Sequence, residues 1–149
     1  MKYKYFLLQL LVITYVFIGP NHVALCLEQT PENLVREFYT WYLDGMNKME
    51  LPELNDEVYK YVYPCTVLRL RIEYETGSKD YNYFIDGNDY WPELSKYITV
   101  GKAIKINDTI SIVPFGFGET KSRSTPNSIV FVQEEKGILY ITKVEHIRE

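Results

Sequence analysis

The sequence has few of the residues that support most catalytic and metal chemistry. Its 149 residues include two cysteines and two histidines, too few for a disulfide framework or a zinc site. The sequence motifs of serine hydrolases, zinc proteases and phosphate-binding loops are also absent. A net charge of −4 argues against a nucleic-acid partner, because phosphate binding depends on clustered positive charge. We therefore expect no cofactor, no metal and no nucleic acid.

The long apolar run of the chain lies at its start and is short. Lys2 and Lys4 precede an apolar stretch over 6–18, which is the layout of a secretory leader. The stretch has 13 residues, whereas a membrane-spanning helix needs about 20. We therefore expect residues 1–26 to be a signal peptide and residues 27–149 to form a single domain without a stable membrane span.

The end of the leader leaves alternatives open for Cys26. Small residues favour cleavage before Leu27, with cleavage after Ala24 as the near alternative. Lipid anchoring through Cys26 is less favoured, because a lipoprotein site needs a small residue where Leu25 stands. The expected location is the periplasm or the surrounding medium. Loss of the leader lowers the net charge to −6 and leaves Cys65 as the single thiol, which we expect to be buried.

Helix signals dominate the first part of the remaining chain. Thr30, Pro31 and Glu32 supply a hydroxyl cap, a proline for the first helical position and an acid for the first turn. Apolar residues then recur every three or four positions as far as Met46, which predicts an amphipathic helix. A short second helix is predicted over about 55–63.

The stretch 65–75 is ambiguous. Residues 68–74 alternate between apolar and polar types, as a half-buried strand does. Pro64 suits equally well the first turn of a helix that ends at Gly77. The residues alone leave helix and strand about equally favoured.

The C-terminal half predicts an antiparallel sheet. Four runs rich in β-branched residues have the period of two that is typical of strands. They are 98–106, 109–117, 128–133 and 138–147. Asn107-Asp108 and Glu135-Lys136-Gly137 suit tight turns between neighbouring strands. The predicted fold class is α+β, with N-terminal helices packed on a four-stranded antiparallel sheet.

Three blocks of sequence resemble a family of small exported bacterial proteins of uncharacterised function. They are VREFYTWY at 35–42, DYNYF at 80–84 followed by NDY at 88–90, and LYITKV at 139–144. That family is similar in architecture to the cystatin-like, nuclear-transport-factor-2-like cone, so the resemblance implies a curved sheet. It also implies that 65–75 is helical, and it brings no catalytic residues.

Aromatic residues gather in the segment 78–97, which is also rich in Asp, Asn and Gly. Rigid aromatic side chains are enriched at binding hot spots. The candidate residues for contact with a partner or ligand are Tyr81, Tyr83, Asp86, Asp89, Tyr90 and Trp91. Alternatively, Tyr83 and Phe84 fill the core. His146, with charged neighbours near the end of the chain, is expected on the surface.

Two functions are compatible with these features. The first is a non-catalytic exported binding module for a protein or a small apolar ligand, with an immunity or inhibitor protein against an envelope-targeting toxin as one specific form. The second is a small cone-fold enzyme or ligand carrier that uses Asp86 or Asp89 as a pocket carboxylate. Scarce histidine and the lack of catalytic motifs favour the binding module.

Overall fold

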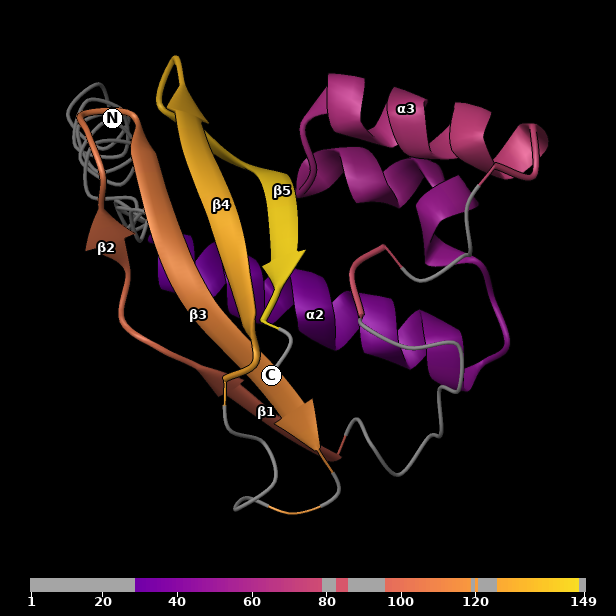
Figure 1. Ribbon diagram of the computed structural model, residues 1–149, viewed down its shortest axis with the longest axis horizontal. Coiled ribbons are helices and arrows are strands. Elements are labelled where there is room, and N and C mark those ends of the chain that lie inside the picture. Colours follow the sequence, from indigo (N-terminus) through magenta and orange to yellow (C-terminus); the bar gives the residue numbers. More distant parts are fainter. Residues whose placement is uncertain (1–28, 79–82, 86–95, 119, 121–125, 148–149) are drawn as a thin grey trace, which may run out of the picture.

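The computed structural model describes residues 29–78, 83–85, 96–118, 120 and 126–147. The elements in chain order are α2 (Pro31–Asn47), η1 (Pro52–Leu54), η2 (Asp56–Lys60), α3 (Pro64–Glu75), β1 (Tyr97–Val100), β2 (Ile104–Lys105), β3 (Ile110–Gly118), β4 (Ser128–Glu135) and β5 (Ile138–His146). In Figure 1, α2 passes behind the sheet and α3 lies beside β5. Within this part of the chain, no helix has the length and hydropathy to cross a membrane.

Helix α2 begins where the capping signals predicted. The Thr30 hydroxyl accepts a 3.2 Å hydrogen bond from the Asn33 amide, and Pro31 occupies the first turn. The helix buries one apolar face, made of Leu34, Val35, Phe38, Tyr39, Tyr42 and Leu43. This face packs against the sheet. It supplies three of the five buried aromatic residues in the described part of the chain.

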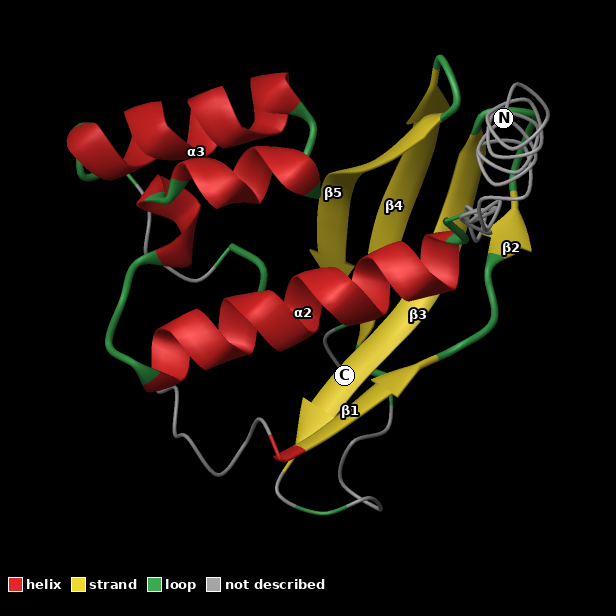
Figure 2. Cartoon of the chain, turned by 180° about the vertical axis from the view of Figure 1, so that it is seen from behind, coloured by secondary structure: helices red, strands yellow, loops and turns green. Residues whose placement is uncertain are grey.

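The strands form one antiparallel sheet in the order β1-β3-β4-β5, and β2 pairs with β3 beside β1. Helix α2 crosses one face of this sheet, as seen from behind in Figure 2. The sheet residues buried beneath it include Val113, Phe115, Val130, Val132 and Ile141. The predicted α+β fold class, with helices on an antiparallel sheet, is confirmed.

The first predicted strand, 98–106, is in fact two short strands. β1 ends at Val100 and β2 begins at Ile104. Opposite the break lies Pro114, which has no N–H for the ladder, although its carbonyl still accepts from the Gly101 amide at 2.8 Å. A Cβ on Gly101 would lie 3.0 Å from the Pro114 ring, so the two backbones approach closely where the strand is interrupted.

The second predicted helix is shorter and tighter than expected. η2 is a 3₁₀ turn over Asp56–Lys60, and the Asn55 side chain caps it by accepting from the Glu57 amide at 2.9 Å. The ambiguous stretch 65–75 is helical, because α3 spans Pro64–Glu75 with Pro64 in its first turn. The helical structure that the family resemblance implied there is confirmed.

The connection from η2 to α3 runs along the outer edge of β5. Tyr63 donates from its amide to the Ile141 carbonyl at 2.9 Å, and Ile141 donates to the Tyr61 carbonyl at 2.7 Å. One turn into α3, the Thr66 hydroxyl donates to the Thr142 carbonyl at 2.8 Å. These bonds fix α3 beside the sheet edge, where Figure 1 shows it.

Candidate functional site

Tyr83 is the one sequence-predicted site residue that lies among the described residues. The other five, Tyr81, Asp86, Asp89, Tyr90 and Trp91, lie outside them. The described segment 83–85 sits where β5, α3 and the core meet. The candidate site is therefore centred on Tyr83.

The two residues that follow Tyr83 are part of the core. Phe84 and Ile85 are buried, and the Phe84 ring lies 4.8 Å from the Phe38 ring in an edge-to-face arrangement. The Phe84 carbonyl accepts a 2.8 Å hydrogen bond from the Tyr39 hydroxyl. The core alternative is therefore confirmed for Phe84, and it anchors the start of the aromatic segment.

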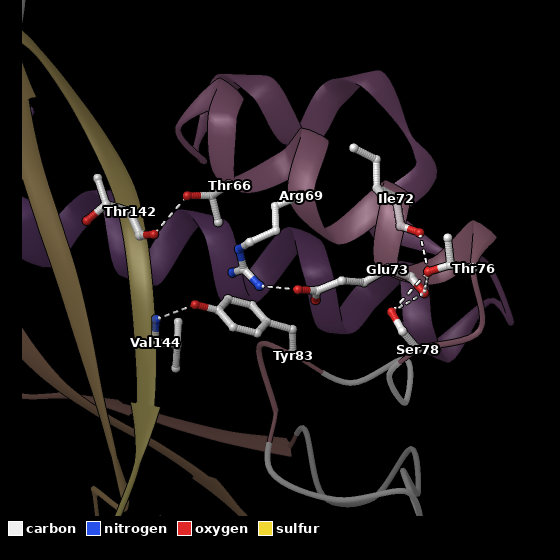
Figure 3. Close-up of polar contacts among 9 residues, drawn as sticks. All are labelled: Thr66, Arg69, Ile72, Glu73, Thr76, Ser78, Tyr83, Thr142 and Val144. Carbon is white, nitrogen blue, oxygen red and sulfur yellow. Dashed lines mark hydrogen bonds and ion pairs between the residues drawn. The ribbon is translucent and has the colours of Figure 1, made fainter.

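Tyr83 itself is half-buried and tied to the last strand at both of its polar ends. Its hydroxyl oxygen accepts from the Val144 amide at 3.2 Å, and its carbonyl lies 3.1 Å from His146 Nε2. Because a carbonyl can only accept, His146 Nε2 carries a proton in this contact. Figure 3 shows the Tyr83 ring between β5 and α3.

His146 is less exposed than expected for a surface residue. Its side chain is half-buried, and its Nδ1 lies 2.9 Å from the hydroxyl oxygen of Ser128, a buried residue at the start of β4. A serine, an imidazole and an orienting acceptor are the parts of a nucleophilic site. Here the serine is buried and the imidazole holds the Tyr83 carbonyl, so the three groups join β4, β5 and the aromatic segment.

Arg69 on α3 covers the free side of the Tyr83 ring. Its guanidinium carbon lies 5.0 Å from the ring centre, and its Nη1 donates to the Glu73 carboxylate at 2.9 Å. The Arg69 side chain is 43% exposed. Cation–π contact and ion pairing together hold a partly solvated guanidinium in one place, as Figure 3 shows.

Arg71 makes a similar but more complete set of contacts on the other side of α3. Its guanidinium donates to the carbonyls of Glu53 at 3.2 Å and Leu54 at 3.1 Å, and to the Asp56 carboxylate at 3.0 Å. It also lies 5.1 Å from the centre of the Tyr59 ring. Arg71 therefore joins α3 to η1 and η2.

Between these two arginines, α3 exposes apolar side chains. Leu68 is 57% exposed and Ile72 is 52% exposed. Cys65, one turn before Leu68, is also exposed, so the expectation that it is buried is wrong. The inward face of the helix is occupied instead by Thr66 and Val67.

Two groups near the site, the half-buried Glu53 and the buried Tyr39, have perturbed ionisation. Burial raises the pKa of Glu53, although a hydrogen bond from the Tyr42 hydroxyl acts in the opposite direction. Burial likewise raises the pKa of the Tyr39 phenol, which stays protonated and can donate to Phe84. In the described part of the chain, no group of three His, Cys, Asp or Glu side chains is placed to hold a metal ion.

Sequence reasoning missed Leu68, Arg69, Arg71 and Ile72 as surface features. The feature of the sequence that could have identified them is the alternation of apolar and polar residues over 68–74. That alternation favoured a strand and a helix about equally. On a helix, residues three and four positions apart share a face, so Leu68 and Ile72 lie together while Leu70 turns inward. Alternation on a helix therefore indicates two apolar faces, of which the sheet can cover only one.

Two solved structures are similar to this chain. The first is the type VI native effector-immunity complex Tae3-Tai3 from Ralstonia pickettii, with 27% identity and a TM-score of 0.70 over 80% of this chain and 97% of the matched chain. The second is the selenomethionine form of that complex, with 27% identity and a TM-score of 0.66 over 80% of this chain and 98% of the matched chain. No family model and no curated protein matches at a significant level.

Proposed function

We propose that this chain is an immunity-type protein that binds a protein effector and blocks its action. The observation that carries the proposal is the similarity to a component of the Tae3-Tai3 effector-immunity complex, at 27% identity and over 97% of the matched chain. That complex joins an effector to its immunity protein. Because the match covers 97% of that chain, the similarity extends over nearly all of its fold and is not limited to one motif.

The contacts of the candidate site favour a binding role over catalysis. The Ser128–His146 pair lies against the Tyr83 carbonyl with a buried serine, so its geometry is that of a structural link. The perturbed carboxyl of Glu53 accepts from the buried Tyr42, and the Glu53 backbone carbonyl accepts from Arg71 on α3. Both groups stabilise the junction of helices and sheet, on which exposed side chains of α3 are displayed.

We further propose that the protein acts outside the cytoplasm. The leader predicted over 1–26 supports export, and an effector that damages the cell envelope would be met there.

The test uses Tae3 from Ralstonia pickettii as the probe. Host cells export Tae3 to the periplasm, with or without co-expression of this chain under its own leader, and growth is followed. We expect the chain to restore growth and to co-elute with Tae3 on size exclusion. The matched control is Phe38→Asp, which places a charge in the core and should abolish protection.

A second experiment tests whether the chain is an immunity protein or an effector. The chain is exported alone, without Tae3, in the same host. An immunity protein leaves growth unchanged, whereas growth arrest would identify the chain as the effector member. Failure of the folded chain both to bind Tae3 and to protect against it would contradict the proposed function.

A further inference from the structure

The outer face of α3 has an unusual composition for a helix exposed to water. Solvent-facing positions of a surface helix are normally polar. Here Leu68 and Ile72, four positions apart, are both more than half exposed, and Cys65 extends the row by one turn. We call Cys65, Leu68 and Ile72 the α3 ridge.

The opposite face of α3 already accounts for the packing of the helix on the protein. Thr66 and Val67 are buried, and Leu70 packs against the core. The Thr66 hydroxyl holds the Thr142 carbonyl of β5 at 2.8 Å. The α3 ridge is therefore not required to attach the helix, and its apolar surface is available to another molecule.

The two arginines that flank the ridge differ in how far their hydrogen-bonding capacity is used. Arg71 donates to two carbonyls and one carboxylate and is 24% exposed. Arg69 is 43% exposed, and its hydrogen bond to Glu73 involves one of five N–H donors. Arg71 thus positions the helix, and Arg69 retains donors that can meet a carboxylate on another protein.

Arg69 is also held in place before any partner arrives. It lies over the Tyr83 ring and is paired with Glu73, so binding would cost little further side-chain entropy. Arginine and tyrosine are both enriched at binding hot spots. The site combines an apolar ridge with a fixed positive charge at one side of it.

We infer that the α3 ridge, together with Arg69, is the surface that contacts the effector, and that the effector offers an apolar groove with a carboxylate at its rim. Charge complementarity selects this occupant, since the held guanidinium of Arg69 matches an acidic rim and the ridge matches an apolar groove. This inference rests on the proposed function. It adds to that function the surface and the chemistry of the partner.

The test measures binding of Tae3 to the exported, purified protein by calorimetry. Leu68→Glu is expected to weaken affinity at least tenfold, because it puts a negative charge in the apolar contact and beside the rim carboxylate. Arg69→Gln is expected to weaken affinity and to flatten its dependence on salt. The matched control is Ile106→Glu. Ile106 is 56% exposed and directly follows β2, and β2 lies at the opposite edge of the sheet from α3 (Figure 1).

The native thiol on the ridge gives a second readout that needs no substitution in the contact. Cys65 is exposed, so a chromogenic disulfide reagent modifies it, and the Cys65→Ser variant identifies its share of the signal. Saturating Tae3 is expected to slow this modification at least tenfold. Circular dichroism of each variant confirms that the fold is retained.

The outcomes separate the inference from the proposed function. If Tae3 binds the wild type and Leu68→Glu equally well and leaves Cys65 equally reactive, the inference is overturned and the proposed function stands. If Ile106→Glu weakens binding as much as Leu68→Glu does, the assignment to α3 is also overturned. If the wild type does not bind Tae3, the proposed function fails and the inference fails with it.

Discussion

The hydroxyl of Tyr39, in the middle of α2, donates a 2.8 Å hydrogen bond to the carbonyl of Phe84, 45 residues further along the chain. Both residues are buried. The Tyr39 ring also stacks on Phe115 of β3, with ring centres 3.4 Å apart. One side chain therefore joins the helix, the sheet and the start of the aromatic segment.

Tyr39→Phe tests this junction. The substitution keeps the ring stack and removes the donor, so the buried Phe84 carbonyl loses its partner. We expect the free energy of unfolding to fall by about 1–3 kcal/mol, measured by urea denaturation. Tyr97→Phe, at an exposed position in β1, should change it by less than about 0.5 kcal/mol. Equal effects of the two substitutions would contradict the assigned role of Tyr39.

Phe84→Ala and Tyr83→Ala distinguish the core from the surface within one dipeptide. Phe84 is buried among aromatic rings, so its truncation should lower the free energy of unfolding by about 3–5 kcal/mol. Tyr83 is half-buried, and its truncation should lower that free energy less while also releasing Arg69. Thermal melts of both variants give the comparison, and a greater loss for Tyr83→Ala would show that the assignment is reversed.

Glu32→Gln probes a contact between the first turn of α2 and the connection from β1 to β2. The Glu32 carboxylate accepts from the Ala103 amide at 2.8 Å, and this bond lowers the pKa of Glu32 below its ordinary value of 4.5. A carboxyl with a lowered folded pKa stabilises the fold above its unfolded pKa, and this stabilisation is lost as the pH falls through the lower folded value.

We therefore expect wild type to unfold at higher urea concentration than Glu32→Gln at about pH 7, and the difference to shrink on acidification to about pH 3. The amide of the variant can still accept from Ala103, so the change isolates the charge. A difference that grew on acidification would mean that the carboxylate is destabilising.

Cys65→Ser tests the exposure of the thiol. An exposed position on the first turn of α3 should tolerate the hydroxyl, so we expect a change in the free energy of unfolding within about 0.5 kcal/mol. Urea denaturation under reducing conditions measures it. A loss well above that range would place the side chain in the protein interior.

The sequence predicted features of the candidate site that depend on residue type, but not those that depend on contacts between distant residues. The aromatic character of the segment singled out Tyr83, whose role in contact with a partner stays a prediction. The core role of Phe84, which the sequence left as an alternative, is confirmed by its burial. Arg69 was missed because its position depends on Tyr83, Glu73 and the orientation of α3. The pair with Glu73, four positions along the chain, follows from residue order once the stretch is helical. The contact with Tyr83 depends on the tertiary structure.

Local chemistry by itself determined the start of α2 and the last hairpin. Thr30 caps the helix through an amide three residues away, and Lys136 and Gly137 both take positive φ between β4 and β5, as a two-residue hairpin turn requires. Such signals depend only on neighbouring residues, so the sequence contains all the information needed. The leader over 1–26 belongs to the same class and remains a prediction.

Contacts between distant residues decided the rest. The stretch 65–75 is compatible with two periods, and its helix is placed by a bond from Thr66 to Thr142, 76 residues away. His146 is half-buried because its ring bonds to Ser128 and Tyr83, although charged residues stand close to it in the sequence. Tertiary structure decided these features because each depends on which surfaces the sheet leaves open.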